Sequence, residues 1–212
     1  MAKLPRAPDV DRLRATPPSL ITIGPDRPLF RIYKRGGGHP TLWNQFRHYG
    51  PLSRFDHHRT NEENEPRFED RGVLYAASDL PTALAEFFQH TRRRINRFDQ
   101  HPWLASFRLP GEVQLLNLTD TFCVRAGASM KLTTGPFAHT QAWSRGFYDA
   151  YPEIHGLYYP SSLTNRPAFV FYERANTDAL FPATTQMHRA LDSPVLLKPL
   201  VIAAQEIAYR LT

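Results

Sequence analysis

The hydrophobic and aromatic residues of this chain occur in short runs, and such runs predict short β-strands. Leu29–Tyr33 is apolar except for Arg31 at its centre, and it leads into the glycine-containing segment Lys34–Gly38. This pattern predicts a strand followed by a flexible loop. Gly72–Ala76 predicts a second strand, and Ser53–Asp56 is expected to be a short strand between the two.

Two segments have the hydrophobic spacing of amphipathic helices. In the first, Ser78 and Asp79 offer an N-cap, and apolar side chains then recur at helical spacing from Leu80 onward. The expected helix ends at about Arg94. The second expected helix is Thr140–Tyr151.

The remaining apolar runs complete the predicted fold. Further strands are expected at Trp103–Leu109, Val113–Leu118, Gly156–Pro160 and Ala168–Glu173. Pro110–Gly111 is expected to join the first two by a turn, and Val195–Arg210 to be a strand followed by a short helix. The sum is an α+β fold, a compact mixed sheet of short strands with a few helices.

Length and composition indicate a globular protein with one main domain. The chain has 212 residues, of which 42% are hydrophobic, enough to form a core and to exclude overall disorder. Nineteen prolines exclude a long helical bundle. We interpret residues 1–28 as an N-terminal extension with at most one short helix, near Val10–Ala15, followed by a domain at 29–212. The polar segment His57–Arg71 is expected on the surface.

The charge balance is basic, and arginine provides most of the surplus. Lysine and arginine together number 26 against 20 acidic residues, which gives a net charge of +6. Arginine suits planar or doubly charged anions, although a merely basic surface explains the same surplus. Arg92–Arg94, with Arg97, either oppose the dipole at the end of the first predicted helix or accept an acidic or nucleic-acid partner.

No metal site, disulfide or P-loop is expected. Cys123 is the single cysteine, so an internal disulfide and a multi-cysteine zinc site are excluded. His57 and His58 are adjacent, and their side chains would point to opposite faces of an extended segment, so we assign them to the surface. Gly36–Gly38 lacks the Gly-Lys-Ser/Thr continuation of a P-loop. No signal peptide or membrane span is recognisable, and the cytosol is the expected compartment.

Five polar side chains interrupt or end the predicted elements. They are Arg31, Arg54, Tyr75, Glu86 and Ser161. Taken singly, each has a structural explanation: Glu86 can face solvent on a helix, and Ser161 can stabilise a turn after a proline. No single position therefore predicts a function.

Taken in order, these residues resemble a known family, the RES-domain toxins. The family is named for an arginine, a glutamate and a serine, which Arg31, Glu86 and Ser161 match. The resemblance runs from about Leu29 to Glu173. Its blocks are Leu-Phe-Arg-Ile-Tyr, Ser-Arg-Phe-Asp, Gly-Val-Leu-Tyr-Ala-Ala with Thr-Ala-Leu-Ala-Glu, Thr-Gln-Ala-Trp, and Ile-His-Gly-Leu-Tyr-Tyr-Pro-Ser-Ser. Residues 57–71 look like a longer insertion than the family needs.

The resemblance implies a fold similar to that of ADP-ribosyltransferases, with NAD⁺ as the substrate. RES toxins degrade NAD⁺ by hydrolysis or phosphorolysis, or use it to ADP-ribosylate a protein, and a co-encoded Xre-type helix-turn-helix antitoxin holds them inactive. The resemblance therefore implies an enzyme without a bound cofactor. Inorganic phosphate is a candidate co-substrate, and an oligomer with the antitoxin is expected.

The implied site residues suit the chemistry of NAD⁺. Arg31 and Arg54 would clamp the diphosphate, and Tyr75 would hold the nicotinamide against an aromatic face. Glu86 would stabilise the positive charge that develops on the ribose as the nicotinamide–ribose bond breaks. Ser161 would hydrogen-bond the ribose or carboxamide and orient Glu86.

Two other functions stay open at the level of the sequence. Transfer of ADP-ribose to a cellular protein would use the same residues and differs only in the acceptor. A non-catalytic module could bind nucleic acid or protein through its surplus of arginine. Direct nucleic-acid binding is not expected, because aromatic residues are not interleaved with the basic ones as a stacking platform.

Overall fold

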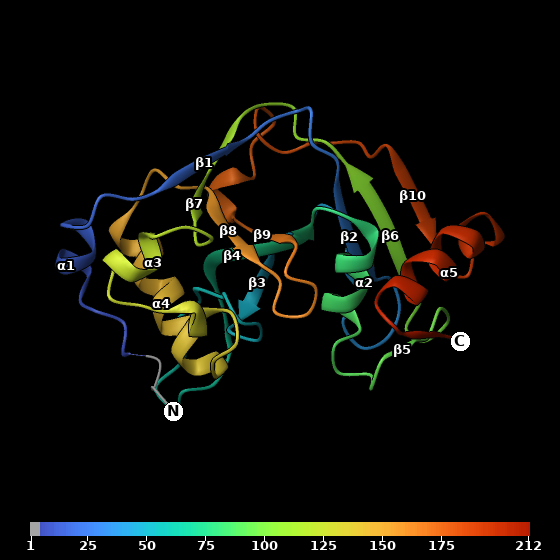
Figure 1. The fold of residues 1–212 in the computed structure, drawn as a ribbon, viewed down its shortest axis with the longest axis horizontal. Helices are drawn as coiled ribbons and strands as arrows, with labels where there is room; N and C mark the ends of the chain where they lie inside the picture. Colours follow the sequence, from blue (N-terminus) through green and yellow to red (C-terminus); the bar gives the residue numbers. More distant parts are fainter. Residues whose placement is uncertain (1–4) are drawn as a thin grey trace.

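The computed structural model describes residues 5–212, which form a nine-stranded sheet, a separate two-stranded sheet and two groups of helices (Figure 1). The large sheet contains β1 (Leu20–Ile23), β2 (Leu29–Lys34), β3 (Arg47–Gly50), β4 (Arg67–Ala77), β6 (Pro102–Phe107), β7 (Val113–Asn117), β8 (Gly156–Pro160), β9 (Pro167–Tyr172) and β10 (Met187–Ala190). The small sheet pairs β5 (Arg94–Ile95) with β11 (Arg210–Leu211). These findings confirm the predicted α+β class and the mixed sheet of short strands.

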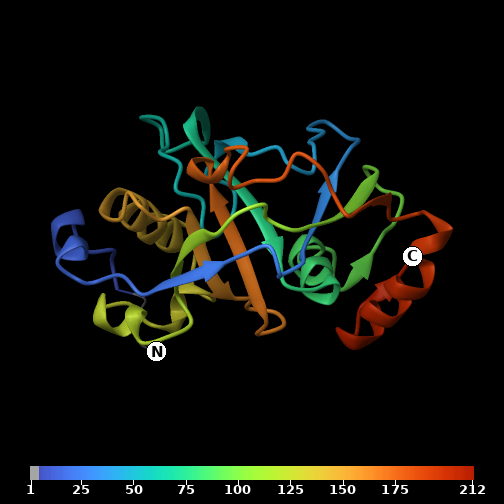
Figure 2. The same cartoon turned by 90° about the horizontal axis from the view of Figure 1, so that it is seen from above.

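The helices lie at opposite ends of the large sheet, as both views show (Figures 1 and 2). One group contains α1 (Val10–Arg14), α3 (Phe122–Arg125) and α4 (Phe137–Ala150), and the other contains α2 (Leu80–Phe87) and α5 (Leu197–Glu206). Short 3-10 turns occur at Met130–Leu132, Glu173–Ala175 and Pro194–Leu196. The sheet order is β1-β7-β8-β9-β4-β2-β6-β10, with β3 on β4, so β4 lies between the two groups of helices.

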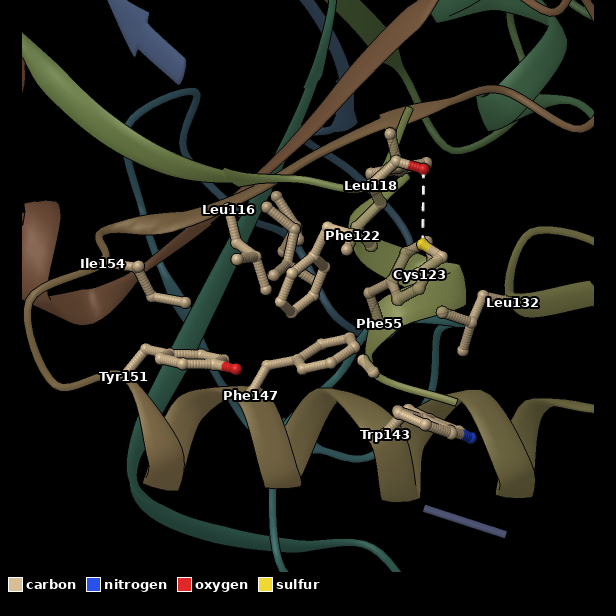
Figure 3. Close-up of a cluster of buried hydrophobic side chains, with 14 of the residues drawn as sticks. Phe55, Leu116, Leu118, Phe122, Cys123, Leu132, Trp143, Phe147, Tyr151 and Ile154 are labelled. Atoms are coloured by element: carbon tan, nitrogen blue, oxygen red, sulfur yellow. Dashed lines mark hydrogen bonds between the residues drawn. The ribbon is translucent and has the colours of Figure 1, made fainter. Parts of the chain in front are cut away.

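The hydrophobic core divides into clusters on both faces of β4. Val73 belongs to the cluster under α3 and α4, whereas Leu74 belongs to the cluster on the other face. Figure 3 shows the first cluster, where Trp143 and Phe147 project from α4. Cys123 is buried in this cluster, and burial raises the pKa of its thiol to about 11. The thiol is therefore a core group.

The N-terminal extension contains the expected short helix, α1, and also a strand that the sequence did not predict. Residues 1–4 of the extension lie outside the described residues. Strand β1 pairs with β7, with Leu20 opposite Leu116. The Trp143 indole donates a hydrogen bond of 3.0 Å to the Pro5 carbonyl, so the extension is fixed against α4.

Three predicted strands are wrong in position or partner. Ser53–Asp56 is a turn, because the Asp56 carboxylate accepts hydrogen bonds from nearby backbone N–H groups and the Asp56 N–H bonds back to the Ser53 carbonyl. The strands at 103–109 and 113–118 exist as β6 and β7, but they do not pair with each other. Strand β6 lies between β2 and β10, and β7 between β1 and β8, so both edges of each are already occupied.

The predicted helix from Leu80 to about Arg94 ends earlier, at Phe87. Residues 88–90 form a turn after the helix, and Arg92 and Arg93 then adopt left-handed backbone conformations, with φ of 52° and 62°, before β5 begins. The dipole explanation for this arginine cluster is therefore wrong, since the cluster is not in the last turn of the helix.

The predicted strand at Val195 is also wrong, because the segment forms a 3-10 turn and α5. Leu196, Leu200, Ala203 and Ala204 are buried and recur at helical spacing. Pro199 does not interrupt the helix because it occupies the third position, where a backbone N–H has no intrahelical partner.

His57 and His58 are buried, and their predicted place on the surface is wrong. Strand β4 begins at Arg67, so the expected surface excursion is shorter than residues 57–71. His57 Nε2 lies 3.2 Å from Glu173 Oε2, which also accepts a 2.8 Å hydrogen bond from the Gly72 N–H. A polar partner more than a hundred residues along the chain thus explains the burial of this histidine.

This buried pair makes the protein sensitive to acid. Burial lowers the pKa of His57 to about 4, although its hydrogen bond to the Glu173 carboxylate opposes the shift. Burial alone would raise the pKa of Glu173, but hydrogen bonds from His57, Gly72 and Tyr148 lower it to about 2. At neutral pH the contact therefore joins a neutral imidazole to a carboxylate.

We expect the free energy of unfolding to fall as the pH falls from 6.5 toward 4. Over this range the unfolded chain binds a proton at His57 that the folded chain does not, which costs about 2 kcal/mol by pH 5. His57→Gln should flatten this dependence in urea unfolding measured from pH 7.5 to 5. The control His39→Gln, at an exposed position, should keep the wild-type slope. Equal slopes in the wild type and His57→Gln would contradict this account.

Candidate active site

The site begins where β2 and β4 separate. Their register contains one residue pair, Phe30 opposite Ala77, and beyond it the strands diverge. Arg31 lies at this opening and donates a 2.9 Å hydrogen bond from Nη1 to the Tyr75 carbonyl. Its Nε is buried and has no hydrogen-bond partner within residues 5–212. Burial, followed by the charge of Arg47, lowers the pKa of Arg31 to about 10.

Helix α2 carries Glu86 to the same place. The Asp79 side chain caps the helix by accepting a 2.8 Å hydrogen bond from the Thr82 N–H, as the sequence predicted. Glu86 lies in the last turn and is largely withdrawn from solvent, so the alternative of a solvent-facing glutamate is wrong. Burial raises the pKa of Glu86, while Ser161 and Arg54 act to lower it.

Ser161 orients the Glu86 carboxylate. Its hydroxyl donates a 2.6 Å hydrogen bond to Oε1 of Glu86. The Ser161 hydroxyl oxygen itself accepts hydrogen bonds from the backbone N–H groups of Leu163 at 3.2 Å and Thr164 at 3.3 Å. Because those donors occupy its acceptor positions, the hydroxyl proton points to the carboxylate. A 2.9 Å contact between the hydroxyls of Thr82 and Thr164 adds a second link from α2 to this turn.

The backbone on both sides of Arg54 is held by polar side chains of α4. Thr140, Gln141 and Ser144 are buried on the inner face of that helix. Their side chains donate hydrogen bonds to three consecutive carbonyls, those of Arg54 at 2.8 Å, Ser53 at 3.0 Å and Phe55 at 2.7 Å. The Thr-Gln-Ala-Trp block of the sequence thus supports the Ser-Arg-Phe-Asp block.

The Arg54 side chain reaches across the cavity to the loop before α4. Its Nη1 donates a 2.5 Å hydrogen bond to the Gly135 carbonyl, and its Cζ lies 4.9 Å from the centre of the Phe137 ring. Burial lowers the pKa of Arg54, and the charge of Glu86 opposes this shift. Arg54 therefore holds the loop over the cavity in this structure.

Asp56 has a buried carboxylate that accepts hydrogen bonds from several segments around the cavity. It accepts two hydrogen bonds from Arg47 Nη2, at 2.8 and 2.7 Å, and one from the Ser53 N–H at 2.9 Å. The Tyr75 hydroxyl donates to Asp56 at 2.8 Å and accepts the Phe55 N–H at 3.2 Å. Burial, then the Asp56 charge, raise the pKa of Tyr75 well above its ordinary value.

These elements enclose a cavity of about 570 Å³, within the range of small-molecule sites. Four of the five predicted residues line it, namely Arg31, Arg54, Tyr75 and Glu86. Ser161 lies behind Glu86 and acts through it, and its neighbour Ser162 lines the wall. The structure thus brings all five predicted residues together around one cavity.

Several cavity residues were not predicted from the sequence. Tyr159 and Phe137 add aromatic surface, and Lys34 adds a second cation on β2. Asp56 belongs to a block that the sequence singled out, and its position next to Arg54 was the available signal. The aromatic residues carried no signal that distinguishes a cavity wall from a core.

Metal and membrane sites were also considered for the described part of the chain. Within residues 5–212, no group of three or more His, Cys, Asp or Glu side chains is arranged to hold a metal ion. None of the helices described there is long and apolar enough to cross a membrane.

The mixed sheet of this α+β fold thus opens onto a cavity, and the wall of that cavity contains the Arg31 guanidinium and the Glu86 carboxylate. The family model described as the RES domain matches residues 28–192, so the chain belongs to the RES domain family. This match confirms the resemblance identified from the sequence.

A solved structure with a similar fold comes from the M. tuberculosis MbcT–MbcA toxin–antitoxin complex. The TM-score is 0.58 with 13% sequence identity, over 90% of this chain and 95% of that chain. At this identity the likeness concerns the fold. No curated protein matches the sequence.

Removing the Asp56 carboxylate should destabilise the protein strongly. Asp56→Ala leaves the Arg47 guanidinium and buried N–H groups without their partner, a loss of about 3–5 kcal/mol in urea unfolding. Asp11→Ala is the matched control, because it removes an exposed partner of Arg14 and should cost less than about 1 kcal/mol. Similar losses of unfolding free energy in Asp56→Ala and Asp11→Ala would show that the hydrogen bonds of Asp56 do not stabilise the site.

Proposed function

We propose that this chain is a toxin that cleaves the nicotinamide–ribose bond of NAD⁺. The observation that carries the proposal is the pairing, in one cavity wall, of a buried Arg31 with an unpartnered Nε and a Glu86 oriented by Ser161. One group attracts an anion and the other stabilises a cation. A dinucleotide that develops positive charge on its ribose presents both.

Arg31 is proposed to bind the diphosphate. A buried guanidinium without a carboxylate partner retains unused donors, and phosphate oxygens match its planar fork. The ligand would therefore recover solvation that Arg31 loses when the protein folds. Arg54 would join it after exchanging the Gly135 carbonyl for a phosphate oxygen.

Glu86 is proposed to act on the ribose. As the bond to nicotinamide breaks, its electron pair leaves with nicotinamide and the ribose becomes electron-poor at the anomeric carbon. An ionised carboxylate close to the 2′-hydroxyl stabilises that charge, and stabilises it more strongly where water is scarce. Ser161 keeps the carboxylate in one orientation before the substrate arrives, which reduces reorganisation during the reaction.

Tyr75 is proposed to hold the nicotinamide. Its hydroxyl is occupied by Asp56 and by the Phe55 N–H, so the side chain is fixed in one position in the cavity wall. A fixed aromatic side chain offers a flat surface to a flat leaving group. Its role is binding and orientation, because its raised pKa keeps the phenol protonated at neutral pH.

The acceptor of the ADP-ribose group is proposed to be water or inorganic phosphate. Transfer to a cellular protein uses the same residues and is distinguished by label from NAD⁺ that ends on a macromolecule. The fold shared with a toxin–antitoxin complex supports the proposal of a toxin with a protein antitoxin, which the family resemblance implies is of the Xre type. We propose the cytosol as its compartment. No bound cofactor is part of this proposal.

Glu86→Gln should lower kcat by about a hundredfold or more with little change in KM, because the carboxylate acts mainly in the transition state. The assay follows nicotinamide release from NAD⁺, with and without inorganic phosphate. Arg31→Ala should instead raise KM, because it removes a binding group.

The matched control is Glu112→Gln at an exposed position, which should retain wild-type rates. Full activity in Glu86→Gln would remove its proposed role. Absence of nicotinamide release from the wild type, in the presence and absence of phosphate and with an acceptor lysate, would remove the proposed function.

The pH dependence of kcat/KM should report on Glu86. Burial raises its pKa above the ordinary 4.5, so activity should fall as the pH drops through this raised value. Ser161→Ala removes a hydrogen bond that lowers the pKa and should move the acidic limb to higher pH. Ser193→Ala, outside the cavity, should leave the limb in place. An unshifted limb in Ser161→Ala would contradict the assignment of that limb to Glu86.

A further inference from the structure

Among the described residues, cations without ion-pair partners gather in the loop after β2, in the segment after α2 and at the C-terminal strand β11. The basic rim, as we name this surface, consists of Lys34, Arg35, Arg92, Arg93, Arg94, Arg97 and Arg210. None of them forms an ion pair with a carboxylate of residues 5–212. Arg97 also has a buried Nε without a hydrogen-bond partner in that range. The basic rim therefore has positive charges without ion-pair partners, and the Arg97 Nε is a hydrogen-bond donor without an acceptor in residues 5–212.

The backbone brings these distant segments together. The Arg35 N–H donates to the His101 carbonyl at 3.0 Å, which joins the loop after β2 to the loop before β6. The Arg210 N–H donates to the Arg93 carbonyl at 2.8 Å, which joins the C-terminus to the segment after α2. Figure 1 shows β5 and the C-terminus side by side at the lower right.

The rim has an unusual backbone as well as an unusual charge. Arg92, Arg93, Gln100 and His101 have φ between 48° and 62°, a left-handed conformation that residues other than glycine rarely adopt. Of the seven such residues among those described, these four lie within one ten-residue segment. Strained conformations persist where the surrounding structure fixes them, and they concentrate at functional sites.

Some arginines elsewhere in the described chain are paired with carboxylates. Arg47 contacts Asp56 at 2.7 Å, and Arg71 contacts Asp149 at 2.7 Å. Arg166 pairs with Glu206 on the surface. None of the cations of the basic rim forms such a pair within residues 5–212, although the segment 90–101 also contains Asp99.

The basic rim is continuous with the cavity. Lys34 belongs to the basic rim and also lines the cavity. His90, which lies between Phe87 and the arginine cluster in sequence, lines the cavity as well. A ligand that extends along the rim therefore reaches the mouth of the proposed active site.

We propose that the basic rim binds an acidic segment of a partner protein. Arginine forks pair with carboxylates in fixed geometry, and a rim of set shape loses little freedom on binding. The rival ligand, a single-stranded nucleic acid, needs several aromatic faces on which bases stack. The rim segment 90–101 offers Phe98 alone, and Trp103 is covered by Arg35, whose Cζ lies 4.4 Å from the ring centre.

The test measures binding of a fluorescein-labelled peptide of alternating Asp and Glu to the full chain, by fluorescence anisotropy at low and high salt. Arg92→Glu/Arg94→Glu should raise Kd about tenfold, and salt should weaken wild-type binding. The matched control Arg6→Glu/Arg12→Glu changes the net charge equally at the N-terminal extension and should leave Kd within about twofold.

Equal losses in the two variants would overturn the proposal, because net charge alone would then explain binding. Tighter binding of a single-stranded oligonucleotide with the same number of charges would overturn it in favour of nucleic acid. Thermal unfolding curves verify that the variants fold, and Arg92→Gln/Arg94→Gln should give an intermediate loss of affinity. Binding is measured without NAD⁺, so its outcome is independent of the proposed reaction.

Discussion

A guanidinium buried at a break in the sheet is the constraint on which the site depends. Arg31 gives up hydration and receives one backbone carbonyl in return, so an uncompensated charge stays inside the molecule. Strands β2 and β4 share one residue pair, and next to it the Arg31 side chain, rather than a further backbone pair, bonds to β4. The cavity lies at that break, and α2 brings the Glu86 carboxylate into the cavity wall.

The precision of the site comes from buried polar groups that do not touch the cavity. Thr140, Gln141 and Ser144 satisfy three carbonyls of an irregular segment, and Asp56 satisfies its N–H groups and an arginine. Irregular backbone carries no ladder of its own, so side chains must replace the missing hydrogen bonds. These side-chain hydrogen bonds fix the backbone of Arg54, although it lies in a turn rather than in a strand or helix. The hydrophobic core under this segment consists mainly of apolar side chains.

The local sequence pattern predicted most of the strands and helices. Contacts between residues far apart in the sequence determine which of these elements pair or pack together. Gly156–Pro160 and the start of α2 were predicted because alternation and capping are properties of neighbouring residues. The β6–β7 hairpin failed because each strand pairs with segments far away in sequence. His57 was assigned to the surface because the sequence around it is polar, whereas its burial depends on Glu173. The family resemblance predicted the five residues and an orienting role for Ser161, but it could not show that Ser161 stays outside the cavity lining while its hydroxyl bonds to Glu86.

The early end of α2 changes the meaning of the arginines that follow it. If the helix had continued to Arg94, those cations would have opposed its dipole and needed no partner. The helix ends at Phe87, and Arg92 and Arg93 then adopt left-handed backbone conformations. At these positions the helix dipole does not stabilise their charges. Charges held at such positions repel one another and lower stability unless something else compensates for them. The proposed acidic segment would supply this compensation, and Lys34 would place that segment next to the cavity that Glu86 lines.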